Sequence, residues 1–155
     1  MSISDQSAFS AIAAELLHTV DAAVVKLRSI SEADAARPLA PGKWSPKQVM
    51  GHLIDSAANN HQRFVRAPAA DPFVGPGYDQ NAWVAANRYR ERPWSELVDL
   101  WAGLNRHLAH VIAGVPAEKL QTRCLIGDSQ PAPLERWIRD YVRHLKHHLA
   151  QIVDG

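Results

Sequence analysis

Four segments of the chain carry apolar residues at steps of three and four positions. This spacing places the apolar side chains on one face of an α-helix. The segments cover about 9–30, 46–67, 94–113 and 133–152. Four helices of about twenty residues, each with a wide apolar stripe, predict an all-α fold, the four-helix bundle. The pattern predicts no strand pair and contains no internal repeat.

Local signals mark where two of these helices begin and end. Ser45 can cap the second helix, Pro46 suits its first position, and Gln48 completes a Ser-x-x-Gln capping box. Gly114 and Pro116 follow the third helix and are expected to end it. The second helix is therefore expected to start at residue 46.

The connections between the predicted helices differ in length. Segments 31–44 and 114–132 are medium loops, whereas 67–93 is long for a compact domain. Within this long crossover, Asp79 is placed to cap a short helix in "YDQNAWVAANRY". We expect residues 1–155 to form a single domain with one crossover, between its second and third long helices.

Composition excludes several classes of protein. The chain has 155 residues, 46% hydrophobic and 21% charged, with a net charge of +1. A chain of this length can bury its own core, so a metal ion is expected to serve function rather than folding. No basic stripe with interleaved aromatic residues is present, which argues against nucleic acid as a partner.

Cysteine content and the N-terminus bear on location. The single cysteine excludes an intramolecular disulfide and any CxxC site. No apolar run approaches the roughly 20 residues that span a bilayer, and no cationic leader precedes an apolar stretch. We therefore expect a cytoplasmic protein without membrane contact.

Histidines are concentrated in the last predicted helix, in "YVRHLKHHLAQI" at 141–152. At about 100° per residue, His144 and His148 fall on the flank of the apolar face, one turn apart, whereas His147 points toward water. Two imidazoles at this spacing can share one cation. His52, on the inward side of the 46–67 helix, is a candidate third ligand.

The residues alone leave other interpretations open. A histidine pair one turn apart also arises by chance on exposed helices, and a buried histidine such as His52 is usually hydrogen-bonded to a neighbour. His61 is expected to be solvated because it lies roughly 180° from His52 around the helix. The remaining histidines, His18, His107 and His110, have no partner at coordinating spacing.

Several motifs together are similar to those of a known family. "GKWSPKQVMGHLIDSAANNHQRF", "GYDQNAWV", "WAGLNRHL" and "YVRHLKHHLAQI" resemble, in order and spacing, the DinB-like superfamily and its YfiT-type branch. The resemblance implies an up-up-down-down four-helix bundle that holds a divalent ion through His52, His144 and His148. The chain departs from the family pattern at "PAPLERW", which replaces a Thr- or Ser-capped start of the last helix.

The resemblance also implies a class of chemistry. Members of the superfamily include thiol-dependent S-transferases, isomerases and proteins called hydrolases, and dimers are common among them. We therefore expect a homodimer that acts on a small-molecule substrate, with zinc or nickel as the metal and a low-molecular-weight thiol as a possible co-substrate. Imidazole ligands suit zinc and nickel, and also iron and copper.

Two residues near the predicted ligands are candidates for catalysis. Asp55 lies one turn after His52 and could accept a proton, although a solvated acid is an equal interpretation. Tyr141 lies one turn before His144 and could line the site, or could be a core tyrosine. The expected function is a metal-dependent S-transferase or hydrolase. The alternatives are a non-catalytic metal- or ligand-binding bundle with a stress-related role, and a bundle without metal.

Overall fold

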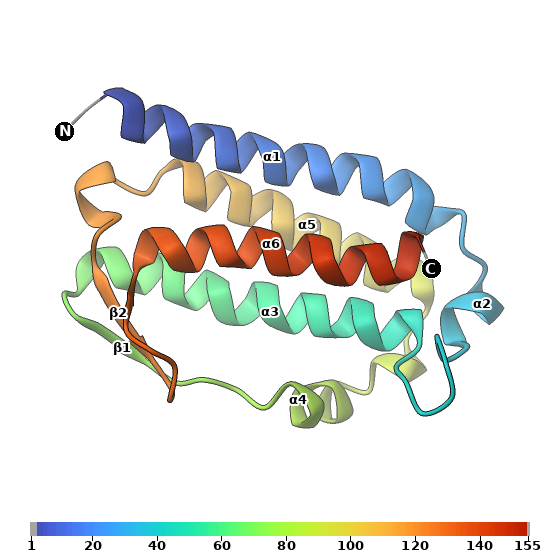
Figure 1. The fold of residues 1–155 in the computed structure, drawn as a ribbon. Helices are drawn as coiled ribbons and strands as arrows, with labels where there is room; N and C mark the ends of the chain where they lie inside the picture. The colour runs from blue at the N-terminus through green and yellow to red at the C-terminus, as the bar shows by residue number, and fades with distance from the viewer. Residues whose placement is uncertain (1–2, 155) are drawn as a thin grey trace.

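The structure is a computed structural model and describes residues 3–154. Four long helices make up most of it. They are α1 (Ile3–Arg28), α3 (Pro46–Arg66), α5 (Trp94–Ala113) and α6 (Leu134–Val153). Helices α1 and α3 do not pack on each other but each packs against both α5 and α6, so the four form a closed ring (Figure 1). The predicted four-helix bundle is confirmed.

The directions of the helices differ in one respect from the expected arrangement. In chain order α1, α3, α5 and α6 run up, down, down and up (Figure 1), not up, up, down and down. The reason is the number of crossovers: an up-up-down-down chain needs two long connections, and this chain has one, between α3 and α5. The expected order is found in space instead, on going round the ring from α1 to α6, α3 and α5.

Shorter elements fill the connections. They are α2 (Glu32–Ala36), η1 (Ala67–Ala69), β1 (Phe73–Gly75), α4 (Gln80–Asn87), η2 (Tyr89–Glu91), η3 (Ala117–Lys119), β2 (Arg123–Ile126) and β3 (Ala132–Pro133). The predicted cap of the crossover helix is confirmed, because the Asp79 carboxylate accepts hydrogen bonds from the backbone N–H of Asn81 and Ala82, at 2.9 and 3.0 Å. None of the helices in residues 3–154 is both long and apolar enough to cross a membrane.

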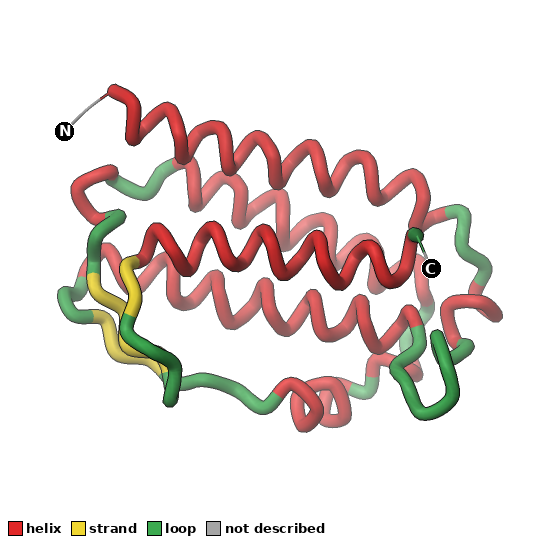
Figure 2. Tube along the Cα trace, in the orientation of Figure 1, coloured by secondary structure: helices red, strands yellow, loops and turns green. Residues whose placement is uncertain are grey.

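A small sheet closes one end of the bundle, where the sequence predicted no strand pair (Figure 2). Strand β1 pairs in parallel with β2, with Phe73 opposite Cys124, and β2 pairs antiparallel with β3. The strands are two to four residues long, too short to show alternation, and β1 meets a strand about fifty positions away in the chain. The prediction was wrong here because the pairing depends on long-range contacts.

The start of α3 follows the local signals in the sequence. The Ser45 hydroxyl accepts a hydrogen bond from the backbone N–H of Gln48 at 3.4 Å, and the Gln48 side chain accepts one from the Ser45 N–H at 3.0 Å. This capping box satisfies two N–H groups that the first turn of the helix leaves free. It fixes the register of α3, and with it the inward direction of the side chains that follow.

The core lies between the four long helices and contains apolar side chains from all of them. The largest fully buried side chains are Trp101, Phe64, Leu16, Leu27, Met50, Leu53, Leu97, Leu108, Ile112, Leu134, Ile138 and Leu145. The histidine cluster described below contributes none of them. Burial of this apolar surface is the main source of stability and does not depend on a bound ion.

Candidate metal centre

Helices α3 and α6 bring three histidines together across the bundle. One ring nitrogen from each of His52, His144 and His148 lies within 4.8 Å of the other two. His52 is 1% exposed, and the two histidines of α6 are half-buried. Because α3 and α6 are neighbours, the inward side of α3 faces the flank of α6. The direction of each side chain around its own helix is the one that the helical spacing predicted.

The spacing of the ring nitrogens fits a shared metal ion. His52 Nε2 and His144 Nε2 are 3.3 Å apart. Two nitrogen ligands at about 2.0–2.1 Å from a tetrahedral ion are separated by about 3.3–3.4 Å. His148 presents the same ring nitrogen, since its Nδ1 lies 3.1 Å from Gln151 Oε1. A hydrogen bond there fixes the tautomer that leaves Nε2 free to bind an ion.

Burial keeps the three imidazoles in the neutral form that binds metals. Desolvation, together with the nearby histidines, lowers the pKa of His52 and of His144 to about 4. Desolvation also lowers the pKa of His148. At neutral pH all three rings therefore keep a lone pair available for a cation.

The other histidines lie outside this group. His147 is exposed, as predicted, although its ring centroid is only 5.3 Å from that of His148. His61 of α3 meets His107 of α5 edge to face, with ring centroids 5.0 Å apart. No spacing in the sequence pairs these two, because their helices lie side by side only in the folded chain.

Asp55 is buried, at 1% exposure, and not solvated. Its Oδ1 accepts hydrogen bonds from the Tyr89 hydroxyl at 2.6 Å and from the Asn87 amide at 2.9 Å. Its Oδ2 is buried without a partner, as is Nδ1 of His52, one turn earlier on the same helix. Desolvation raises the pKa of the Asp55 carboxyl, and the two hydrogen bonds oppose that rise. Asp55 thus attaches the crossover to α3 beside the histidines.

The close contact between the crossover and α3 depends on a glycine. A Cβ atom at position 51 would lie 2.0 Å from Cδ2 of Tyr89. Gly51 therefore allows the tyrosine ring to lie directly on α3, where its hydroxyl reaches Asp55. This is a steric requirement that the sequence alone did not reveal.

Tyr141 lies in the core, 3% exposed. Its hydroxyl donates a short hydrogen bond to Oδ1 of Asn105, on α5. Burial raises the pKa of this phenol far above its usual range, so the hydroxyl stays protonated. These contacts orient the Tyr141 ring between α3, α5 and α6, with Phe64 packed edge to face against it.

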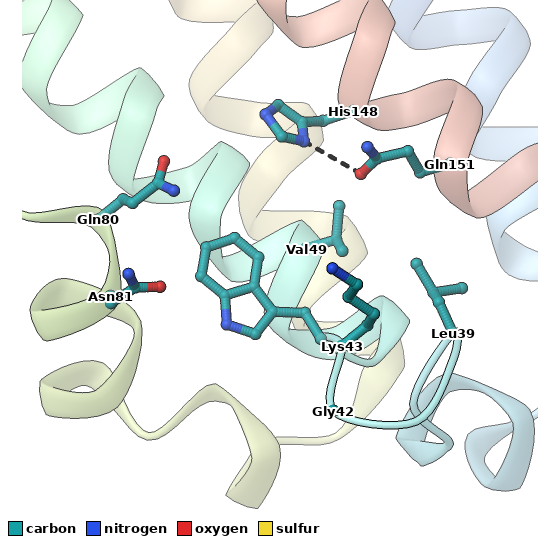
Figure 3. A pocket seen from close by; sticks show the side chains of 9 residues that line it. Leu39, Gly42, Lys43, Val49, Gln80, Asn81, His148 and Gln151 are labelled. Carbon is teal, nitrogen blue, oxygen red and sulfur yellow. Dashed lines mark hydrogen bonds between the residues drawn. The ribbon is translucent and has the colours of Figure 1, made fainter.

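A cavity of about 620 Å³ borders the histidines at the C-terminal end of α6. Residues from four segments line it: Leu39, Gly42, Lys43, Trp44, Val49, Gln80, Asn81, His148 and Gln151 (Figure 3). The Trp44 ring lies 5.4 Å from that of His52, and the first residues of α4 form the wall opposite α6 (Figure 3). The volume is in the range of small-molecule sites.

A second cavity, of about 230 Å³, borders the histidines on the other side. It follows α3 from Ser56 toward Arg63 and α6 from His144 back toward Trp137. The histidine cluster therefore lies between two cavities. No motif in the sequence indicated a role for Arg63, Trp137 or Gln151. The available signal was their helical spacing from His52, His144 and His148.

Comparison with known proteins agrees with this architecture. The model of the DinB superfamily matches residues 9–152. A protein of Halalkalibacterium halodurans named "Putative metal-dependent hydrolase" is 26% identical over 124 residues, which cover 80% of this chain and 72% of that protein. A protein of Bacillus pumilus with the same name is 29% identical over 127 residues, covering 81% and 71%.

A solved structure has the same fold. YfiT from Bacillus subtilis superposes with a TM-score of 0.79 and 22% identity, over 99% of this chain and 87% of that one. It is described as a probable metal-dependent hydrolase with an unusual four-helix bundle topology. The family match spans all four long helices, from residue 9 in α1 to residue 152 in the last turn of α6. The chain belongs to the DinB superfamily.

Proposed function

We propose that the protein is a metal-dependent enzyme that holds one divalent ion, zinc or nickel, through His52, His144 and His148. The observation that carries this proposal is the meeting of three neutral imidazoles, from two helices, between two cavities. The names of the related hydrolases support it. When bound, the ion would supply Lewis acidity toward a water or a thiol that reaches it.

The remaining residues would bind and orient the reactants. The larger cavity accommodates a low-molecular-weight thiol, with amide groups of Gln80, Asn81 and Gln151 and the Trp44 ring available to contact it. The smaller cavity would take a second, smaller reactant. Two cavities that each reach one histidine of the group, His148 in the larger and His144 in the smaller, favour transfer of a thiol to an acceptor. A hydrolase, which needs room for one substrate and a water, is the second candidate.

A non-catalytic binding role is the alternative. A structural metal site is usually closed by a fourth protein ligand, whereas a catalytic site keeps a position open. Within residues 9–154, the part of the chain with described side chains, the group that could hold a metal contains these three histidines and no fourth cysteine, acid or histidine. This open arrangement favours the enzyme.

The test of the function is elemental analysis followed by activity screens. Purified protein is expected to contain about one zinc or nickel per chain. With glutathione, bacillithiol or mycothiol present, the loaded protein should conjugate an electrophilic acceptor, and His52→Ala should not. Hydrolysis of model esters and amides is measured in parallel. A protein that takes up no divalent metal would contradict the proposal.

Asp55 has a positioning role in this proposal. When Nε2 of His52 holds a metal, its Nδ1 carries the proton, and the buried Oδ2 of Asp55 is available to accept it. We expect Asp55→Asn, which removes the charge but keeps the size, to weaken metal binding about 10- to 100-fold. Competition with a chromophoric chelator measures this affinity.

The matched control is Asp99→Asn, which changes an exposed acid on α5 paired with Arg28. It should bind metal as tightly as the wild type. Circular dichroism establishes that both variants are folded. If Asp55→Asn binds metal with unchanged affinity, Asp55 does not position His52, and its role is limited to holding the crossover.

A further inference from the structure

Arg63 carries a positive charge that is buried and has no acidic partner. The residue is 9% exposed and lies on α3, three turns beyond His52. Its guanidinium donates two long hydrogen bonds, both 3.4 Å, to Asn60 Oδ1 and to the backbone carbonyl of Pro76. Among residues 9–154, whose side chains the structure describes, no carboxylate lies within 4.0 Å of it. Buried arginines are almost always paired with a negatively charged group, so we expect an anion to bind beside Arg63.

A second donor beside Arg63 is also without a partner. Nε1 of Trp137, on α6, is buried and makes no hydrogen bond. The guanidinium carbon of Arg63 lies 5.4 Å from the centre of the Trp137 ring, a cation–π contact that fixes the two groups relative to each other. Both residues line the cavity of about 230 Å³. A buried indole N–H normally has a hydrogen-bond partner.

The charges around this cavity leave it positive. Asp140 is the acidic residue among those that line the cavity. Its carboxylate is already paired with Arg143 at 3.4 Å and with Arg136 at 3.9 Å. Burial raises the pKa of the Tyr78 phenol, another wall residue, so that side chain is neutral at physiological pH. The charge of Arg63 is therefore not cancelled within the cavity.

The cavity also reaches the proposed metal site. Ser56, Asn60 and Arg63 continue the inward side of α3 that begins at His52. On α6, which runs antiparallel to α3 (Figure 1), Trp137 and His144 lie on the same wall. A molecule in this cavity can touch His144 at one end and Arg63 at the other.

We propose that this cavity binds the carboxylate of a small acidic substrate, with Arg63 and the Trp137 indole N–H as its donors. The planar guanidinium matches a carboxylate, and a volume below the roughly 300 Å³ of typical ligand pockets limits the substrate to a small acid. Binding of the carboxylate to this cavity does not require a metal ion. That the acid is a substrate rests on the proposed function.

Benzoate is the probe, with uncharged benzamide for comparison, and the full-length protein is used both metal-loaded and metal-free. The readout is the indole N–H resonance of Trp137 in ¹H–¹⁵N spectra, assigned with Trp137→Phe. We expect benzoate, and not benzamide, to shift this resonance in both forms of the protein. Binding in the metal-free form separates this subsite from direct ligation of the ion by benzoate.

Variants of Arg63 test the donor. Arg63→Gln should weaken benzoate binding about 10- to 100-fold, because a hydrogen bond to a charged group is lost. Arg63→Lys, which keeps the charge, should lose less. Arg66→Gln, an exposed arginine on the same helix, is the matched control and should bind as the wild type does.

The outcomes are distinguishable from failure of the metal site. If benzoate leaves the Trp137 resonance unchanged, binds only the metal-loaded protein, or binds the Arg63 variants as tightly as the wild type, the subsite proposal is overturned whatever the metal content. If Arg63→Gln does not fold, Arg63→Lys still decides by the same resonance. Trp137→Phe lacks that resonance, so its affinity for benzoate is measured by titration calorimetry against the wild type, and both variants should bind benzoate more weakly. Metal per chain, measured separately, tests the proposed function alone.

Discussion

Replacing His52, His144 or His148 by alanine is expected to remove most of the bound metal, whereas His147→Ala is expected to leave it in place. In the proposed site each of the three would contribute one of three protein ligands, and nitrogen atoms from all of them lie within 4.8 Å of one another. The loss should exceed the about 10- to 100-fold that removal of an outer-shell partner costs. The measurement is metal per chain after gel filtration.

His147 is a demanding control for this series. Its ring centroid lies 5.3 Å from that of His148, so it shares the local sequence and surroundings of a proposed ligand. It is nevertheless exposed and not a member of the group. A site emptied by His147→Ala but still filled in His144→Ala would show that the assignment of ligands is wrong.

Removal of the metal is expected to lower the melting temperature without unfolding the protein. An ion present at about a thousand times its dissociation constant stabilises the native state by about 4 kcal/mol. For a chain of this length, that corresponds to a loss of about 8–16 °C after treatment with EDTA. The apolar side chains of α1, α3, α5 and α6 form a core of their own, so a cooperative transition should persist. Calorimetry with and without EDTA, and after restoring zinc, measures the melting temperature and the cooperativity of unfolding.

The same experiment separates a catalytic ion from a structural one. A protein that is unfolded after EDTA treatment would mean that the ion holds the bundle together, and the enzyme proposal would lose its main support. His52→Ala is the control. Its melting temperature should already be lowered in the presence of zinc, and EDTA should lower it little further.

Local rules predicted a large part of the fold. The capping box at Ser45, the cap at Asp79 and the four apolar stripes each depend on residues a few positions apart, and each is present in the structure. The short helix α2 and the three strands were not predicted, because elements of two to five residues carry too little periodic signal. The directions of the four helices follow from the number of long crossovers, which is one in this chain.

For the candidate site, the sequence by itself determined that His144 and His148 share the inner flank of α6 and that His147 does not, because these directions follow from 3.6 residues per turn. Only the tertiary structure decided the contacts between segments far apart in the chain. It placed His52 Nε2 3.3 Å from His144 Nε2, 92 positions away, brought Tyr89 to Asp55 across 34, and laid Arg63 against Trp137. Helical periodicity gives the direction of a side chain around its own axis but not which helix lies opposite. That is decided by the packing of all four apolar stripes at once.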